Sequence, residues 1–147
     1  MGSHTHNYQT MENYESKQQQ ILLPADAVYA MISRFDNLTP ALQDKVEEWQ
    51  ADENHCSFKA KGFTVKLQII DKEAPKYVKI TGDEGGIPID FFFWIQLQPV
   101  AERDTRMRLV LHAELNMMMR MMIGNKLKTA LDQIAEAMAK SFNGMAY

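Results

Sequence analysis

Two polar pairs in this sequence have residue types and spacing suited to proton transfer. His112 and Glu114 lie two residues apart in an alternating segment, so they share one face of a predicted strand. A histidine beside a carboxylate could act as a general base with its orienting partner. Asp90 and Arg108 fall on the same polar phase of their segments. That phase is opposite to the apolar one, so we expect all four side chains to face solvent.

Other polar side chains could reach the protein interior, but they form no recognisable catalytic set. The candidates lie on the shared phase of the first two predicted strands, and they are Tyr14, Ser16, Gln18, Gln20, Glu47 and Trp49. The single cysteine, Cys56, has no activating sequence signal nearby and would need a histidine partner in space. The histidines and the cysteine lack the spacing of a zinc site. We therefore expect no catalytic residue, no metal site and no cofactor.

Methionine is unusually frequent, with 11 residues in 147, and five of them lie within residues 117–122. Such a cluster on a helix points in nearly every direction, so it cannot all be core. Two interpretations stay open: a deformable pocket mouth or partner surface, or a helix start inserted between the sheet edge and a short helix and partly exposed by accident. Met118 and Met122 are four residues apart and share a face. Copper(I) could use thioethers, but helical spacing scatters these sulfur atoms, so we reject a metal site.

Composition excludes several classes of protein. The chain is 46% hydrophobic with a net charge of -3, which suits one domain with a real core. Sixteen basic against 19 acidic residues give no cationic surface for nucleic acid. No segment is apolar and long enough for stable membrane insertion, and no secretory signal is present, so we expect a cytoplasmic protein. We expect residues 1–11 to be a flexible leader, of the kind that an expression vector adds, and residues 12–147 to be a single domain.

Helical periodicity appears twice. After a first strand over residues 14–23, Pro24 starts a helix of about three turns, whose apolar stripe is Val28, Met31, Ile32 and Phe35. Thr39 is expected to cap a short second helix that ends at Gln43. A long C-terminal helix follows Asn116, its expected N-cap. Its apolar stripe consists of Ile123, Leu127, Leu131, Ile134, Met138 and Phe142. Gly124 interrupts the first half of this helix and indicates a kink or a close approach to a strand or ligand.

Between the helices the hydrophobic period changes to two, which indicates strands. Residues 71–76 are expected to form a loop, and the strongest turn signal is at residues 82–86. The pattern predicts a meander of antiparallel strands with one apolar face. The expected strands cover residues 46–51, 56–60, 63–69, 77–81, 89–97 and 107–115.

This order of elements resembles the START-like helix-grip superfamily (SRPBCC), which includes polyketide cyclase/dehydrase and lipid-transfer proteins. The resemblance is carried by residues 21–32, Ile-Leu-Leu-Pro-Ala-Asp-Ala-Val-Tyr-Ala-Met-Ile, and by Asn37-Leu38. It implies an α+β helix-grip fold, in which a curved antiparallel sheet of about seven strands wraps around the long C-terminal helix. Two short helices follow the first strand, and the sheet and helix enclose a cavity for an apolar ligand. The superfamily has no universal catalytic signature, so no catalytic residue is carried over.

The resemblance implies a domain that binds a hydrophobic or amphipathic small molecule, such as a lipid, sterol or polyketide-like compound. The interior phase of the predicted strands is nearly free of ionisable residues, which favours binding without chemistry. A polyketide cyclase/dehydrase-type enzyme is the alternative, and a protein-interaction module is a third class. For any single apolar strand residue, packing in a dry core is the competing interpretation. The residues expected to contact ligand are Leu67, Ile69, Phe91, Phe93, Ile95, Leu109, Leu111, Met118, Met122 and Ile123.

Two large aromatic residues, Phe92 and Trp94, fall on the polar phase of their strand. Large apolar groups on a wet face indicate that something covers them, either the short helices or another subunit. If the outer face is otherwise free, we expect homodimerisation through it.

Overall fold

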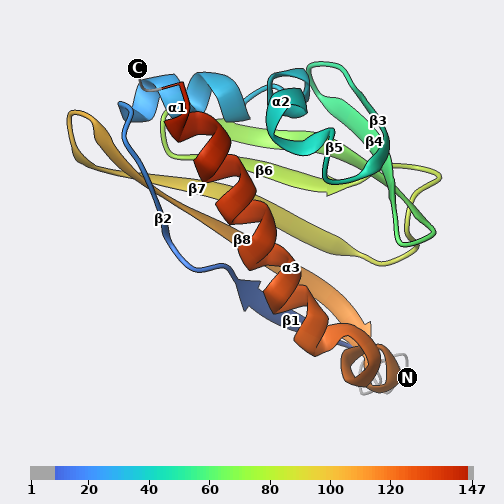
Figure 1. The fold of residues 1–147 in the computed structure, drawn as a ribbon. Coiled ribbons are helices and arrows are strands. Elements are labelled where there is room, and N and C mark those ends of the chain that lie inside the picture. The colour runs from blue at the N-terminus through green and yellow to red at the C-terminus, as the bar shows by residue number, and fades with distance from the viewer. Residues whose placement is uncertain (1–8, 146–147) are drawn as a thin grey trace.

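A computed structural model, which describes residues 9–145, shows one antiparallel sheet curved around a long helix (Figure 1). The strand order is β1-β8-β7-β6-β5-β4-β3, and β2 also pairs with β8. This confirms the expected helix-grip fold class, with eight strands where the sequence predicts about seven. The strands are β1 Gln9–Glu15, β2 Gln19–Ile21, β3 Glu47–Ala51, β4 His55–Ala60, β5 Phe63–Glu73, β6 Tyr77–Gly82, β7 Phe91–Ala101 and β8 Asp104–Asn116.

The extra strand arises because the first predicted strand is interrupted at Ser16, which is buried. The Ser16 backbone N–H donates to the Leu109 carbonyl at 2.8 Å, and the Leu109 N–H donates to the Ser16 hydroxyl at 2.9 Å. A side-chain oxygen thus replaces a backbone acceptor, and the ladder breaks between β1 and β2. Residues 9–11, which we expected to belong to the leader, are part of β1; residues 1–8 lie outside the described part of the chain.

The helices are α1 Ala25–Ile32, the 3-10 helix η2 Phe35–Leu38, α2 Thr39–Leu42 and α3 Met117–Asn143. The first helix is shorter than predicted, because α1 ends at Ile32 and Phe35 lies in η2. The prediction that Thr39 caps the second helix is wrong. Its hydroxyl instead accepts a hydrogen bond from Trp49 Nε1 at 2.8 Å, which ties α2 to β3. The expected loop at residues 71–76 also begins later, because β5 continues through an irregularity after Ile69 to Glu73.

Hydrogen bonds hold α3 to one side of the sheet. The Asn116 side chain caps the helix by accepting from the Met119 N–H at 2.8 Å, as predicted. Near its other end, the Asn143 side chain accepts from the Leu22 N–H at 2.7 Å and donates to the Gln20 carbonyl at 3.0 Å. These bonds place α3 over β2 and its neighbours β1 and β8 (Figure 1). The strands from β3 to β7 curve away beside the helix, and α2 packs against α3 there.

In the second half of the predicted C-terminal stripe, Leu131, Met138 and Phe142 are buried in the core, whereas Ile134 is exposed. Gly124 is buried as well. A Cβ added there would lie 3.2 Å from the Tyr14 hydroxyl of β1, so the glycine marks a close approach to a strand. Within residues 9–145, no helix is long and apolar enough to cross a membrane.

Candidate ligand-binding cavity

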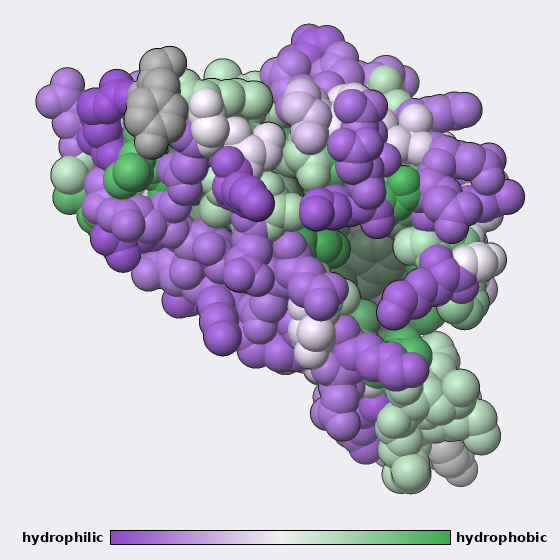
Figure 2. All heavy atoms as spheres, viewed as in Figure 1, coloured by the Kyte–Doolittle hydropathy of each residue, from purple (hydrophilic) through white to green (hydrophobic). Residues whose placement is uncertain are grey.

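A cavity of about 360 Å³ lies between α3 and the part of the sheet that α3 does not cover. Figure 2 shows it as a hollow beside α3, with apolar walls and a mainly hydrophilic rim. The sheet supplies Trp49, Cys56, Phe58, Ala60, Leu67, Ile80, Phe93 and Ile95; α3 supplies Ala130, Gln133, Ile134, Ala137 and Met138; the segment from η2 to the start of β3 supplies Phe35, Leu38, Leu42, Lys45 and Val46. No residue of β1, β2 or β8 is in this lining.

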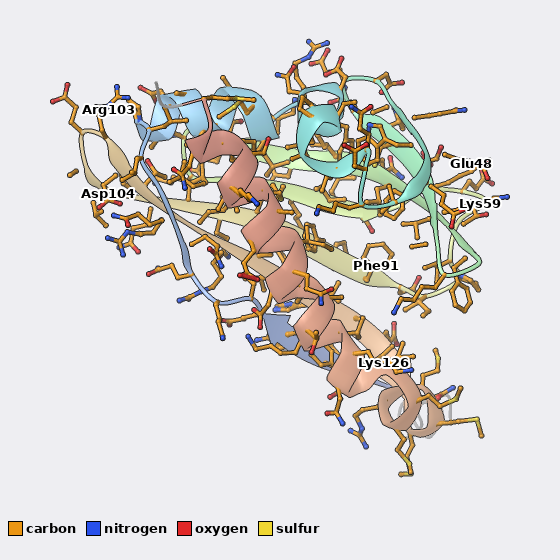
Figure 3. All side chains as sticks on the ribbon, in the orientation of Figure 1. Glu48, Lys59, Phe91, Arg103, Asp104 and Lys126 are labelled. Carbon is orange, nitrogen blue, oxygen red and sulfur yellow. The ribbon has the colours of Figure 1, made fainter. Side chains whose placement is uncertain are left out.

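A β-bulge turns Trp49 into the cavity. Glu47 pairs with Lys59 and Gln50 pairs with Ser57, so β3 has one more residue than β4 over this stretch. Glu48 takes up the extra residue with a left-handed φ of 55° and forms a 3.2 Å ion pair with Lys59 (Figure 3). Trp49 then stacks on Phe58, with ring centroids 5.9 Å apart. The bulge therefore separates Glu47, which is exposed, from Trp49, although simple alternation places both on one face.

Cys56 is the buried thiol of the cavity wall. Burial, and secondarily the nearby charge of Asp52, raises the pKa of this thiol from about 9 to about 12. The thiol is therefore protonated at neutral pH. It offers the cavity a small, weakly polar surface rather than a thiolate nucleophile.

The predicted ligand contacts divide according to their position across the sheet. Leu67, Phe93 and Ile95 line the cavity. Leu109 is fully buried and Leu111 partly buried, both on β8, where α3 packs directly on the sheet. Ile69 packs against the core without lining the cavity. Phe91 lies at the start of β7 (Figure 3). Its ring lies against Gly82, and it is not among the lining residues.

The predicted contacts Met118, Met122 and Ile123 also lie outside the lining. Met118 is 70% exposed and Met122 is 65% exposed. Together with Met117 and Met121 they form the methionine tip, where the first turns of α3 project beyond the sheet (Figures 1 and 2). Ile123 is partly buried. The exposure of the four methionines fits either a partner surface or a helix start that is partly exposed by accident.

The predicted polar pairs do not meet at the cavity. His112 lies edge-on to Trp94, with ring centroids 4.7 Å apart, and Arg108 pairs with Glu15 at 3.6 Å. Asp90 is exposed, and neither it nor Glu114 is in the lining. Of the polar candidates on the first predicted strand, Ser16 accepts a hydrogen bond from the Leu109 backbone N–H through its hydroxyl, and it does not line the cavity. Among residues 9–145, no three His, Cys, Asp or Glu side chains gather into a group that could hold a metal ion.

The residues that sequence reasoning missed come mainly from short or irregular segments. Leu38 and Leu42 lie on η2 and α2, where too few turns exist for a periodic signal. Ile134 belongs to the predicted stripe, and its 38% exposure has a local reason, since it borders the cavity. Lys45 has no sequence signal at all, because a lysine in a turn is ordinarily a solvated surface residue.

The comparisons with known proteins agree with this geometry. A protein-family model described as CoxG, one of the subunits of carbon monoxide dehydrogenase, matches residues 18–146. This chain belongs to the CoxG family. No curated protein matches this CoxG-family chain.

Solved structures show the fold of this CoxG-family chain. Norcoclaurine synthase from Thalictrum flavum superposes with a TM-score of 0.75 at 12% identity, covering 99% of this chain and 91% of that one. A Thermobifida fusca protein solved by NMR superposes with a TM-score of 0.68 at 10% identity, covering 91% of this chain and 94% of that one. The Mll3558 protein of Rhizobium loti superposes with a TM-score of 0.65 at 14% identity, covering 90% of this chain and 98% of that one. These structures share the helix-grip fold that the sequence predicts.

Proposed function

We propose that this CoxG-family domain binds one hydrophobic or amphipathic small molecule in the cavity beside α3. The observation that carries the proposal is the cavity itself, about 360 Å³ in volume with predominantly apolar walls. Small-molecule sites have volumes of about 300–1,000 Å³ and few polar groups, so this cavity lies at the small end of the range. A structure of norcoclaurine synthase, 14% identical to this chain, is in complex with dopamine and hydroxybenzaldehyde, so a protein of this fold can hold small molecules.

The proposed contacts are the predicted residues Leu67, Phe93 and Ile95, joined by Trp49 and Phe58. Two of the other predicted contacts, Leu109 and Leu111, have a supporting part in this proposal: they keep α3 packed on β8, which leaves the neighbouring strands free to enclose the ligand. The polyketide cyclase/dehydrase-type alternative would have to work with Lys45, Gln133 and the protonated Cys56, since the lining holds no carboxylate or imidazole. Binding without chemistry fits this lining better.

The family description favours a second candidate function, that of an accessory subunit. CoxG is described as a subunit of carbon monoxide dehydrogenase, which corresponds to the third class considered above, an interaction module. As an accessory subunit, the domain would hold its cavity ligand beside a partner enzyme. Co-purification of the chain with a carbon monoxide dehydrogenase produced in the same cells would support it, and clean separation of the two would contradict it.

Homodimerisation and a cytoplasmic location remain predictions. On the outer face of the sheet, Lys79 Nζ lies 4.5 Å from the Phe92 ring centroid, and Trp94 packs against His112. These contacts cover the aromatic rings only in part, since Phe92 is 36% exposed. Light scattering after gel filtration should show a dimer that Trp94→Ala weakens. A monomer at high concentration, unchanged by the substitution, would contradict it.

Native mass spectrometry of the purified protein, followed by organic extraction, tests the binding proposal. We expect a retained small molecule, or a thermal shift with at least one member of a panel of fatty acids, sterols and aromatic polyketides. If no small molecule is retained and no member of the panel gives a thermal shift, the binding proposal is contradicted.

A further inference from the structure

The cavity lining is asymmetric in charge. Of the described residues that line it, only Lys45 carries a charge at neutral pH, and the lining includes no acidic side chain. The other side chains with polar atoms are Gln133, Cys56 and Trp49, and the Trp49 N–H is already bonded to Thr39.

Lys45 is also free to bind. It lies in the turn between α2 and β3, and its side chain has no ion pair or hydrogen bond to any residue within 9–145. Of the acidic residues near it in sequence, Glu48 is paired with Lys59, while Asp44 and Glu47 are exposed and form no ion pair with Lys45. A lysine at such a rim can lay its aliphatic stem along apolar surface while its ammonium group stays at the water boundary.

We infer that the cavity takes a single-chain carboxylic acid, with its alkyl tail inside and its carboxylate at the rim on Lys45. This inference rests on the proposed binding function and names its ligand class. The Gln133 side chain, from α3, lines the same cavity and supplies an amide N–H donor for the same carboxylate. An ammonium–carboxylate hydrogen bond is stronger than a neutral one, so Lys45 gives the site its preference for an anion.

The volume limits the length of the tail. A methylene group occupies roughly the volume of a water molecule, about 30 Å³, so a cavity of 360 Å³ holds about twelve such groups. A tail of about ten carbons fits with its head group outside. Decanoate is therefore a suitable probe, and 1-decanol and decyltrimethylammonium carry the same tail with a neutral and a cationic head.

Trp49 provides the signal for the experiment. The chain has two tryptophans, and Trp94 lies outside the cavity lining, so in a Trp94→Phe background the emission reports on the cavity wall. Each of the three probes is titrated at pH 8 into this protein. The same titrations are repeated with Lys45→Glu and with Lys126→Glu. Lys126 projects from α3 outside the lining and provides the same change in net charge (Figure 3).

We expect Lys45→Glu to raise the Kd of decanoate about tenfold, to lower that of decyltrimethylammonium, and to leave that of 1-decanol within about twofold. Lys126→Glu should leave all three within about twofold. If 1-decanol binds but Lys45→Glu leaves the Kd of decanoate unchanged, the carboxylate inference is overturned and the binding function stands. The same holds if Lys126→Glu raises the Kd of decanoate as much as Lys45→Glu does. If none of the probes binds, the carboxylate inference is overturned, and the binding proposal is decided by native mass spectrometry and the wider ligand panel.

Discussion

At the residue scale, the structure gives several side chains roles that their sequence neighbours do not indicate. Trp49 faces the cavity only because Glu48 adopts a left-handed backbone conformation, which a sequence pattern cannot show. Ser16 replaces a backbone acceptor and so divides one predicted strand into two. Both are single-residue departures from strict alternation, and each moves the side chains around it.

The raised pKa of Cys56 leads to a residue-scale prediction. The chain has one cysteine, so alkylation by iodoacetamide reports on this thiol alone. Because only the thiolate reacts and burial raises the pKa to about 12, the native protein should be labelled slowly at pH 8. Its labelling rate should rise about tenfold per pH unit up to at least about pH 10, whereas an ordinary thiol levels off near its pKa of about 8.5.

Urea-unfolded protein is the control for this experiment, and its labelling rate should level off near the ordinary value. A native protein whose rate also levels off below pH 10 would contradict a buried, protonated Cys56.

At the scale of elements, the sequence predicts type and order well. The amphipathic stripe, the Asn116 cap and the alternating strands all appear as expected, because local periodicity and capping chemistry determine them. The position of α3 across the sheet could not be predicted. The position of α3 depends on long-range hydrogen bonds, such as the one that the Asn143 side chain accepts from the Leu22 N–H. Because of this position, Leu67 lines the cavity, whereas Leu109, on the same apolar face of the sheet, is buried in the dry core.

Gly124 allows a test of how closely α3 approaches β1. Gly124→Ala removes a helix penalty of about 1 kcal/mol, but the new methyl group meets the Tyr14 hydroxyl at 3.2 Å. In a Tyr14→Phe background the alanine should stabilise the protein by about 1 kcal/mol, and in the wild type by at least about 0.5 kcal/mol less. Urea unfolding measures both. Equal effects in the two backgrounds would contradict the contact.

The methionine tip is predicted to contribute little to stability. Met121 is 78% exposed, and lysine has nearly the same helix propensity, so Met121→Lys should change the free energy of unfolding by less than about 0.5 kcal/mol. Met138→Ala, in the core of the same helix, should lose about 2–5 kcal/mol. A loss above about 1 kcal/mol for Met121→Lys would mean that the tip is packed.

At the scale of the whole molecule, the two sides of the sheet have different roles. The strands β1, β2 and β8 hold α3 through hydrogen bonds and a dry core, and the strands from β3 to β7 enclose the cavity. Two alanines of α3 separate these roles. Ala137 lines the cavity, whereas Ala139, two residues later, is buried in the core.

Phenylalanine substitutions at these alanines therefore form a matched pair. Ala137→Phe should fill the cavity and destabilise the fold by no more than about 1 kcal/mol, mostly through helix propensity. Ala139→Phe should overpack the core and lower the free energy of unfolding by about 1–3 kcal/mol. Thermal unfolding of both variants shows whether the cavity is present in solution.

The most direct test of ligand binding is a titration of the Trp94→Phe protein with 1-decanol, followed by Trp49 emission, with and without Ala137→Phe. We predict a saturable change with one site per chain that Ala137→Phe abolishes while the protein stays folded. A change that does not saturate, or one that is equally large in the Ala137→Phe protein, would contradict binding in this cavity.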